Sequence, residues 1–562
     1  MDAMQAYKRW LQLAVEDADV RAELESLDPA DEKAVTERFG ASLAFGTGGL
    51  RGLLGAGSNR MNIYVIRRAT QGLANHLKAS CERPAVAIAH DSRIKSDLFS
   101  REAARVLAAN GVTVWLYPRL EPTPALSFAV RYHGCQAGIC VTASHNPAAY
   151  NGYKAYGADG GQFTDDDANA TLACIEKLDY FDDVTLCDYD EAVADGRIRL
   201  IPDATLSAYL SAIRALSVAD CRKDLRVVYS PLNGAGHECV THMFALQGVT
   251  DVTIVPEQEY PDGTFPTCPY PNPEMPEAMA LGLALAKEKS ADLLIATDPD
   301  CDRVGAAAKD ASGAYTLLTG NEVGLLLLDF ICNSKQQSGT MSKNPVVVTT
   351  IVSSDMTDAI AKAYGAECRR TLTGFKYIGE QIGLLEDAGE VERFLFGFEE
   401  SCGYLSGPHC RDKDAVNACM LLCEMASYYK TRGESLYTAM QALYARYGYF
   451  CNGVESFAFP GLEGKSKMAA FMASLRKNPP KKLAGYAVEE VLDYQHGMTA
   501  NVTLPPANVL EFRLSGGCKA IARPSGTEPK LKIYVFGQAA KKEDADAQCA
   551  ALLKAFAALI DA

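Results

Sequence analysis

The stretch 298–303, DPDCDR, places three carboxylates at alternate positions directly after an apolar run. If the loop brings Asp298, Asp300 and Asp302 within about 4 Å of one another, each pair repels by roughly 4 kcal/mol at a surface-like dielectric. A bound cation relieves this repulsion, and an all-oxygen set of ligands suits Mg²⁺. An EF-hand does not fit, because its sixth position requires Gly and is occupied here by Arg303. The alternative is a solvated acidic turn, and the spacing favours metal binding.

A second stretch, ARPSGTEPKLKIY (522–534), gathers cations and hydroxyls around a glycine turn. Arginine can hold a phosphate with two donors, while hydroxyls and turn amides take the remaining oxygens. The spacing GxxxxGK[ST] of an NTPase phosphate loop is absent. The alternative is a plain polar hairpin. The candidate phosphate-binding residues are Arg523, Ser525, Gly526 and Thr527.

A third stretch, VTASHNPAAYNGYK (141–154), ends a strand-like run with Ser144 and His145. No G-x-S-x-G turn surrounds the serine, which disfavours a hydrolase. Neighbouring side chains on an extended chain point apart, so we do not expect the serine and histidine to form a proton-relay pair. A serine that accepts and donates a phosphoryl group needs instead a divalent cation and cationic side chains. The first two stretches supply both.

Two shorter stretches give weaker signals. GFEES (397–401) carries Glu399 and Ser401 at a strand end, where such groups can accept the hydroxyls of a polyol such as a sugar. FGTGGLRG (45–52) is expected to be a flexible glycine-rich loop carrying Arg51. A surface turn is at least as good an interpretation of either stretch taken alone.

The elements that must position these residues alternate between strand-like and helical patterns. Three successive rounds of alternation each close with an apolar strand that runs into a polar cluster. Because ligands gather at the carboxyl ends of strands in α/β sheets, one shared central cleft is expected. The last hundred residues show paired strands and two helices, typical of an α+β domain with an antiparallel sheet. We predict three similar mixed α/β domains and a C-terminal α+β domain around the cleft, at residues 1–213, 214–336, 337–455 and 456–562.

Composition narrows the class of protein. The chain has 562 residues, of which 48% are hydrophobic, and 55 basic against 70 acidic residues give a net charge of −15. An acidic surface repels nucleic acid, and an anionic substrate would need local clusters of Arg and Lys. The 18 cysteines are scattered singly, as expected for small buried side chains in a reducing compartment. With neither a long apolar run nor a signal peptide, we expect a cytoplasmic protein without nucleic-acid or membrane partners.

In chain order, the motifs TASHNP, DPDCDR, GFEES and RPSGTEPK resemble the signatures of the α-D-phosphohexomutase superfamily, the phosphoglucomutases and phosphomannomutases. The resemblance covers essentially the whole length and is greatest to the longer bacterial phosphoglucomutase branch. It implies four domains in a heart-like arrangement. It also implies that a phosphoserine transfers its phosphoryl group to a sugar monophosphate. The resulting bisphosphate, such as glucose 1,6-bisphosphate, reorients in the cleft and returns its other phosphate to the serine.

The resemblance also implies a role for each matching residue. Ser144 matches the phosphorylated serine, which ligates the metal through its phosphate, and Asp298, Asp300 and Asp302 match the magnesium ligands. The remaining matches are Lys154 for proton transfer, Arg51, His145, Arg303 and Lys413 for the active site around the phosphoserine, Glu399 and Ser401 for the sugar hydroxyls, and Arg523, Ser525, Gly526 and Thr527 for the non-reacting phosphate.

The implied function is a Mg²⁺-dependent interconversion of glucose 1-phosphate and glucose 6-phosphate, with glucose 1,6-bisphosphate as intermediate and activator. Mannose phosphate ranks second and pentose phosphate third, because the double glutamate of GFEES fits a reader of glucose. Two hypotheses from other classes remain: a catalytically silent sugar-phosphate-binding protein, which would have lost a motif residue, and a metal-dependent phosphatase. We expect a monomer or a weak homodimer.

Overall fold

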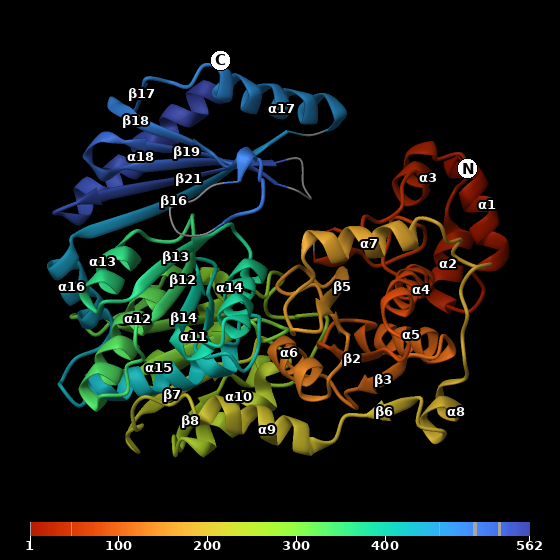
Figure 1. Cartoon of the computed structure of the whole chain (residues 1–562), viewed down its shortest axis with the longest axis horizontal. Coiled ribbons are helices and arrows are strands. Elements are labelled where there is room, and N and C mark those ends of the chain that lie inside the picture. Colours follow the sequence, from red (N-terminus) through yellow and green to blue (C-terminus); the bar gives the residue numbers. More distant parts are fainter. Residues whose placement is uncertain (1, 47, 460, 498–502, 526–529, 562) are drawn as a thin grey trace.

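The computed structural model describes residues 2–46, 48–459, 461–497, 503–525 and 530–561. Four β-sheets follow one another along the chain, three of mixed strand direction with flanking helices and a fourth that is antiparallel (Figure 1). This architecture confirms the predicted fold class. Over the described ranges, every helix is too short or too polar to cross a membrane.

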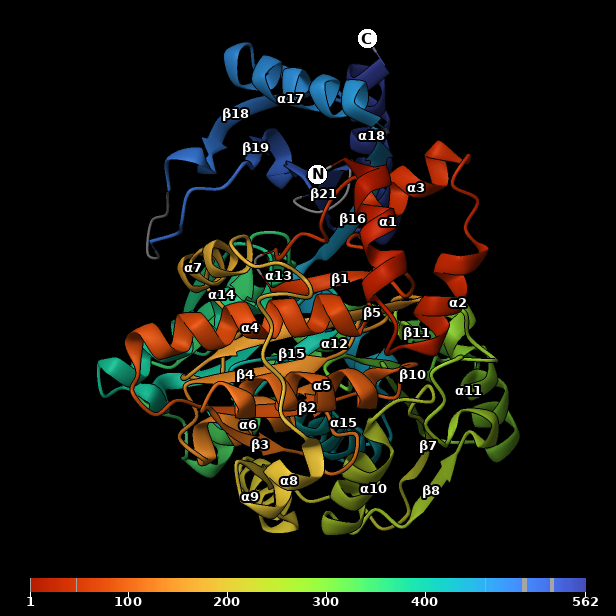
Figure 2. The ribbon, with the colours of Figure 1, turned by 90° about the vertical axis from the view of Figure 1, so that its right-hand side faces the viewer.

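The first domain holds a six-stranded sheet of order β1-β5-β4-β2-β3-β6, in which β4, β2, β3 and β6 are parallel and β5 and β1 antiparallel. Its strands are β1 (Gly49–Leu53), β2 (Ala85–His90), β3 (Thr113–Leu116), β4 (Ala137–Val141), β5 (Tyr150–Gly157) and β6 (Ile198–Leu200). Its helices are α1 (Ala3–Leu13), α2 (Ala18–Ser26), α3 (Glu32–Phe39), α4 (Ile63–Ser80), α5 (Ser96–Ala109), α6 (Thr123–Tyr132), α7 (Asp165–Ile175), α8 (Tyr189–Ala194) and α9 (Asp203–Arg214). Figure 2 shows α4 and α5 lying across one face of this sheet.

One expectation for this domain was wrong. The glycine-rich stretch around Arg51 is not a free loop throughout, because β1 pairs with β5 and sets Arg51 opposite Gly152. Pairing requires close backbone approach at both glycines: a Cβ atom on Gly49 would lie 1.8 Å from the Tyr153 carbonyl oxygen, and one on Gly152 would lie 2.4 Å from that of Thr142. The glycines that suggested flexibility therefore permit a tight edge pairing.

The second sheet has the order β11-β10-β9-β7-β8, with β9, β7 and β8 parallel and β10 and β11 antiparallel. Its elements are β7 (Arg226–Ser230), α10 (Gly236–Leu246), β8 (Asp251–Ile254), η1 (Pro256–Gln258), α11 (Pro276–Lys289), β9 (Leu293–Thr297), β10 (Val304–Lys309) and β11 (Tyr315–Leu318). Strand β9, LLIAT, is buried along its whole length, as expected for a central parallel strand. The acidic stretch DPDCDR is the turn that joins β9 to β10.

The third sheet has the order β13-β12-β14-β15, and only β15 runs antiparallel to its neighbour. Its elements are α12 (Gly320–Ser338), β12 (Val346–Thr350), α13 (Met356–Ala363), β13 (Glu367–Thr371), α14 (Phe375–Asp387), η2 (Val391–Arg393), β14 (Phe394–Glu399), β15 (Gly403–Leu405), α15 (Ala415–Lys430) and α16 (Leu436–Tyr447). Helix α15 is buried from Ala415 to Ser427 and shares one hydrophobic core with α6, α9 and α10. This core joins the three α/β domains.

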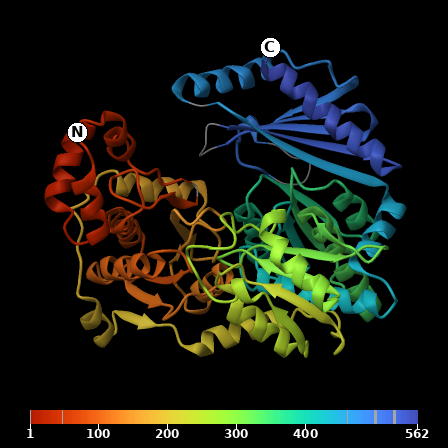
Figure 3. The ribbon, with the colours of Figure 1, turned by 180° about the vertical axis from the view of Figure 1, so that it is seen from behind.

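The fourth sheet is antiparallel throughout, in the order β16-β21-β20-β19-β18-β17. Its elements are β16 (Tyr449–Ala458), α17 (Gly461–Lys477), β17 (Lys482–Leu483), β18 (Tyr486–Asp493), η3 (Tyr494–His496), β19 (Leu510–Leu514), η4 (Ser515–Gly517), β20 (Lys519–Pro524), β21 (Lys530–Ala539) and α18 (Lys542–Asp561). Figure 3 shows this domain above the third, with the N-terminal domain at the other end of the molecule. Residue 336 lies inside α12 and residue 455 inside β16, and the exact domain boundaries stay a prediction.

Candidate active site

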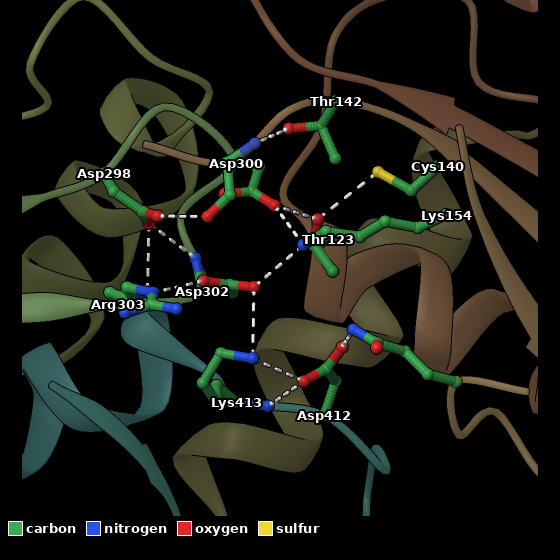
Figure 4. A network of polar contacts seen from close by, with 12 residues as sticks. Thr123, Cys140, Thr142, Lys154, Asp298, Asp300, Asp302, Arg303, Asp412 and Lys413 are labelled. Atoms are coloured by element: carbon green, nitrogen blue, oxygen red, sulfur yellow. Dashed lines mark hydrogen bonds and ion pairs between the residues drawn. The ribbon is translucent and has the colours of Figure 1, made fainter. Parts of the chain in front are cut away.

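The three aspartates of the β9–β10 turn point their carboxylates toward one another (Figure 4). Ligand oxygens of Asp298, Asp300 and Asp302 all lie within 4.8 Å of one another, and the three side chains are buried. The turn is tightened by Cys301 in the left-handed region at φ 54°. The backbone amides of Asp302 and Arg303 donate to Asp298 Oδ1 at 3.1 and 3.0 Å. The turn thus concentrates negative charge at one buried point.

Lysines from two other domains meet this charge. Lys154 Nζ, on β5, lies 2.7 Å from Asp300 Oδ2 and 3.1 Å from Asp302 Oδ2, and Lys413 Nζ lies 3.4 Å from Asp302 Oδ2. Burial opposes the charge on Asp302, but Lys154, Lys413 and Arg303 outweigh it and lower the pKa of that carboxyl. Burial, together with the other two aspartates, raises the pKa of Asp298. The spacing of the three carboxylates in the sequence predicts that a bound cation relieves the repulsion among them. In the structure, the two lysines relieve part of it.

The acidic group also fits a divalent cation. Asp300 Oδ1 and Asp302 Oδ1 are buried and accept no hydrogen bond from any described residue. A buried carboxylate oxygen without a donor is destabilising, so these two atoms point to a missing partner. Carboxylate oxygens are the ligands that Mg²⁺ prefers. The chemistry of the donor set therefore matches the predicted magnesium.

Ser144 lies in the turn between β4 and β5 and faces the acidic group. Its side chain is buried, and Oγ donates to Asp298 Oδ2 at 3.0 Å, across the boundary between the first two domains. Contrary to the expectation from an extended chain, Oγ also lies 3.2 Å from His145 Nδ1. The reason is the backbone: Ser144 has φ 53°, so the two neighbouring side chains fall on the same side. Burial and the cations Arg303 and Arg51 lower the pKa of His145, which favours the neutral imidazole.

Two arginines flank this centre. Arg51 NH1 donates to Asn146 Oδ1 in the serine turn at 3.3 Å. Arg303 NH1 donates to the Ser401 carbonyl at 3.0 Å and pairs with Glu274 at 3.1 Å. The metal turn of the second domain is thereby connected to the GFEES turn of the third.

The GFEES residues form the turn between β14 and β15. Glu399 is buried, and its Oε1 accepts a hydrogen bond from the Gly374 amide at 2.8 Å. Burial raises the pKa of Glu399, and burial beside Glu399 raises that of Glu400 to about 7. A cavity of about 440 Å³ between the third and fourth domains is lined by Glu400, Ser401 and Lys532, among others.

The fourth domain contributes the end of β20 and the start of β21. Arg523 lies opposite Lys532 in the antiparallel pairing of β20 with β21, and the Ser525 amide donates to the Lys530 carbonyl at 2.8 Å. Lys532 reaches the same 440 Å³ cavity as Ser401. Two predicted phosphate-binding residues, Gly526 and Thr527, lie outside the described residues.

Sequence reasoning missed residues that hold the site together. Thr123, the first residue of α6, donates from Oγ1 to Asp300 Oδ2 at 2.9 Å. Asp412 accepts from Lys413 Nζ at 3.0 Å and from Tyr156 OH at 2.9 Å, which ties the third domain to the first. A signal for the second existed: Asp412 belongs to the charged run RDKD, which would be exposed unless it formed a buried ionic network. Thr123 carries no comparable signal.

A second group of ligand-type atoms has a structural explanation. One atom each from His409, Cys410 and Asp414 lie within 4.8 Å of one another. Asp414 is the N-cap of α15, where it accepts from the Asn417 amide at 2.9 Å and from Tyr209 OH at 2.9 Å. His409 Nε2 lies 2.7 Å from the other oxygen of the same carboxylate. Helix capping accounts for this cluster without a metal.

Comparisons with known proteins agree with this geometry. Sequence models described as "Phosphoglucomutase/phosphomannomutase, alpha/beta/alpha domain" I, II and III match residues 42–181, 207–313 and 319–447. A phosphoglucomutase from Staphylococcus aureus is 36% identical over 505 residues, which cover 88% of this chain and 90% of the relative. The chain belongs to the phosphoglucomutase/phosphomannomutase family, whose members are isomerases, and the predicted family is thereby confirmed.

Solved structures with low sequence identity share the four-domain fold. Parafusin, a phosphoglucomutase from Paramecium crystallised in an open form, has a TM-score of 0.71 at 18% identity, covering 93% of this chain and 95% of its own. A phosphoglucomutase/phosphomannomutase family protein from Burkholderia thailandensis has a TM-score of 0.69 at 18% identity, covering 92% and 96%. Because each match covers at least 92% of this chain, both extend into the C-terminal antiparallel domain.

Proposed function

We propose that this protein is a Mg²⁺-dependent phosphoglucomutase that interconverts glucose 1-phosphate and glucose 6-phosphate through a phosphorylated Ser144. The observation that carries the proposal is the position of Ser144 Oγ, 3.0 Å from Asp298 Oδ2 at the edge of three buried carboxylates, two of which pair with Lys154. Phosphoryl transfer needs little more than a positioned oxygen, a divalent cation and fixed positive charge. The choice of glucose is supported by the relatives, which are phosphoglucomutases.

The metal in this proposal is held by Asp298, Asp300 and Asp302, with a phosphate on Ser144 as a further ligand. When bound, Mg²⁺ supplies a positive charge that stabilises the transferring phosphoryl group. Lys154 and Lys413 lie close enough to the same carboxylates to add fixed positive charge from two further domains. They also lower the pKa of Asp302, which preserves the ability of that carboxylate to ligate a cation.

In the forward half-reaction, a hydroxyl oxygen of the sugar monophosphate forms a bond to phosphorus as the bond to Ser144 Oγ breaks. The hydroxyl releases its proton as the new bond forms, and Ser144 Oγ takes up a proton as its own bond to phosphorus breaks, so the product is glucose 1,6-bisphosphate and the number of protons is unchanged. Lys154 is proposed to assist this proton transfer. His145 contacts the unphosphorylated serine and is proposed to handle its proton. Arg51 is proposed to steady the serine turn, which it contacts in the structure, and Arg303 is proposed to tie the metal turn to the GFEES turn.

Two further groups are proposed to hold the sugar in either orientation. Glu399 and Ser401 read the sugar hydroxyls, and Arg523, Ser525, Gly526 and Thr527 hold the phosphate that is not reacting. After the bisphosphate turns end for end, its other phosphate returns to Ser144 and the enzyme is restored. Such an exchange requires a clamp that recognises phosphate at either end of the intermediate, which hydroxyls and Arg side chains provide.

The test is a coupled assay of glucose 6-phosphate formation from glucose 1-phosphate, with Mg²⁺ and a trace of glucose 1,6-bisphosphate. Ser144→Ala should lose activity by several orders of magnitude. Ser100→Ala, which truncates another buried serine on α5, should retain it. Peptide mass analysis after incubation with the bisphosphate should find the phosphate on Ser144. Full activity in Ser144→Ala, or phosphate on a different residue, would overturn the role of this serine.

The same assay separates the alternatives. A panel of glucose, mannose and pentose 1-phosphates compared by kcat/KM identifies the preferred sugar, which we propose to be glucose. Release of inorganic phosphate without isomerisation would indicate a phosphatase, and saturable binding without turnover a silent binding protein. We further propose a monomer or weak homodimer in the cytoplasm, to be checked by light scattering and cell fractionation.

A further inference from the structure

Arg93 lies three residues after the end of β2, and both terminal nitrogens of its guanidinium group point at the serine turn. Its side chain is fully buried. NH1 donates to the carbonyl oxygens of Pro147 and Tyr150 at 3.0 and 3.1 Å, and NH2 donates to those of Ser144 and Asn146. Four main-chain carbonyls of one turn therefore converge on a single side chain.

This convergence matters because the serine turn is strained. Ser144 has φ 53°, a left-handed conformation that costs a non-glycine residue on the order of 1–3 kcal/mol. The carbonyl dipoles that meet at Arg93 would repel one another without a donor between them. A planar guanidinium can serve several acceptors from fixed directions, whereas a lysine ammonium has only three donors on a flexible stem. Arginine is therefore suited to holding this backbone shape.

The backbone amide of Ser144 is also held in place by residues that follow β2. The Ser144 amide donates to Thr142 Oγ1 at 2.8 Å, and that hydroxyl donates to Asp91 Oδ2 at 2.6 Å. Asp91 in turn accepts from the Arg93 amide at 3.0 Å and lies 3.3 Å from its Nε. The two backbone polar groups of Ser144 are thus tied, through short chains of contacts, to two residues at the end of β2.

The second domain, which carries the acidic turn, packs on the same arginine. The guanidinium carbon of Arg93 lies 5.0 Å from the centroid of the Phe265 ring, within the range of a cation–π contact. Gly263 forms a parallel bridge with Arg93, and a Cβ atom there would lie 2.5 Å from the Ile94 amide nitrogen. Arg93 therefore touches both the turn that holds Ser144 and the domain that holds its partner, Asp298.

We propose that Arg93 is a positioning residue for phosphoryl transfer: it fixes the backbone of the serine turn so that Ser144 Oγ faces the acidic group. The proposal rests on the proposed function, in which Ser144 carries the phosphoryl group. Arg93 does not touch the reacting atoms in the structure. Its loss should therefore slow the chemical step and leave recognition of the sugar and of the far phosphate unchanged, since those groups belong to the third and fourth domains.

The experiment compares Arg93→Lys with Arg67→Lys. Arg67 is an equally suitable buried arginine, with its side chain 5% exposed and paired with Glu16 and Glu102, but it lies on α4 away from the serine turn. We expect Arg93→Lys to lower kcat by about tenfold to hundredfold, the range for a small misplacement of a reacting group, with KM for glucose 1-phosphate within about twofold. Arg67→Lys should keep kcat within about twofold even if it unfolds at a lower temperature.

Hydrogen exchange gives a second readout that does not depend on turnover. Amides of residues 142–153 should exchange faster in Arg93→Lys and not in Arg67→Lys. If the wild type shows no mutase activity, the proposed function fails, while exchange still shows whether Arg93 holds the turn. Wild-type kcat in Arg93→Lys, or equal loss of kcat and rise of KM in both variants, would overturn the positioning role.

If Arg93→Lys does not fold, Phe265→Leu replaces it. This variant removes the aromatic face and leaves every carbonyl contact in place. A fall in kcat of about twofold to tenfold, with unchanged KM and faster exchange at residues 142–153, supports the proposal. Wild-type kcat and wild-type exchange in Phe265→Leu would show that the contact between Arg93 and the second domain does not position Ser144. That result would overturn the proposed link from Arg93 to the acidic group.

Discussion

Lys154→Met removes the cation that bridges two of the three aspartates while keeping a side chain of similar length. Lys154 Nζ lies 2.7 Å from Asp300 Oδ2 and 3.1 Å from Asp302 Oδ2, and its side chain is 9% exposed against 0% and 1% for the two carboxylates. Removing one partner of a buried ion pair typically costs about 3–5 kcal/mol, because the opposite charge is left uncompensated. Without divalent metal, we expect the free energy of unfolding of the first two domains to fall by about that amount.

Magnesium should reverse much of this loss. A cation bound by Asp298, Asp300 and Asp302 supplies the charge that the methionine side chain lacks, and the variant no longer has an ammonium group that repels the metal. Mg²⁺ should therefore raise the unfolding temperature of Lys154→Met more than that of the wild type, by the linkage between binding and folding. The mutase activity should remain low, because the proposed proton partner is gone.

The assay is thermal unfolding of both proteins in EDTA and across a magnesium titration. Lys154→Arg, which keeps the positive charge, is the matched control and should respond to magnesium as the wild type does. Two results would refute the reasoning. One is a Lys154→Met variant as stable as the wild type in EDTA, and the other is an equal magnesium-dependent rise in unfolding temperature for both.

Two further predictions concern neighbouring buried groups. Thr123→Val keeps the shape of the side chain but removes the 2.9 Å hydrogen bond to Asp300 Oδ2, so the magnesium concentration for half-maximal activity should rise by about 10–100-fold, whereas Thr123→Ser should change it little. Burial raises the pKa of Glu121 from 4.5 to about 7, against the opposing effect of Arg119. The protonated carboxyl therefore stabilises the fold fully below pH 4.5, and this stabilisation is lost as the pH rises through 7. The glutamine of Glu121→Gln cannot ionise. The free energy of unfolding of this variant, measured in urea and compared with that of the wild type, should therefore increase by up to about 3 kcal/mol between about pH 4.5 and 8. A difference that does not change with pH would contradict the raised pKa of Glu121.

The order of strands and helices could be predicted from the sequence because each α/β round contains an uninterrupted apolar strand. β4 and β9 are apolar and buried along their whole length, a pattern typical of a central strand. β1 was missed because its glycines indicate a loop, and only the tertiary approach of β5 gives them a role. The sheet order likewise depends on contacts between distant segments and has no local signal.

The acidic group could be predicted from its alternate spacing, but the partners of that group could not. Ser144 and His145 meet only because the serine adopts a left-handed conformation, which nothing in the letters SHNP specifies. Asp412 and Thr123 act through contacts with residues of other domains: the charged run RDKD gives only an indirect sign of the first, and nothing in the sequence indicates the second. Residue types thus indicate which groups do chemistry, while the three-dimensional contacts show which groups hold them in place.

The charge around the acidic group explains how an acidic protein can receive an anionic substrate. The chain has a net charge of −15, yet three cations, Lys154, Lys413 and Arg303, lie within 4.0 Å of carboxylate oxygens of the acidic group and offset much of its charge before metal binds. Under the proposed function, Mg²⁺ adds two positive charges, and a phosphate monoester on serine carries about −1.5 to −2 at pH 7. Metal and phosphate would thus neutralise each other in a centre whose fixed charges already largely offset one another. Because the phosphoryl group would pass from Ser144 to a sugar hydroxyl within the same centre, the transfer would leave no large uncompensated charge buried between the domains.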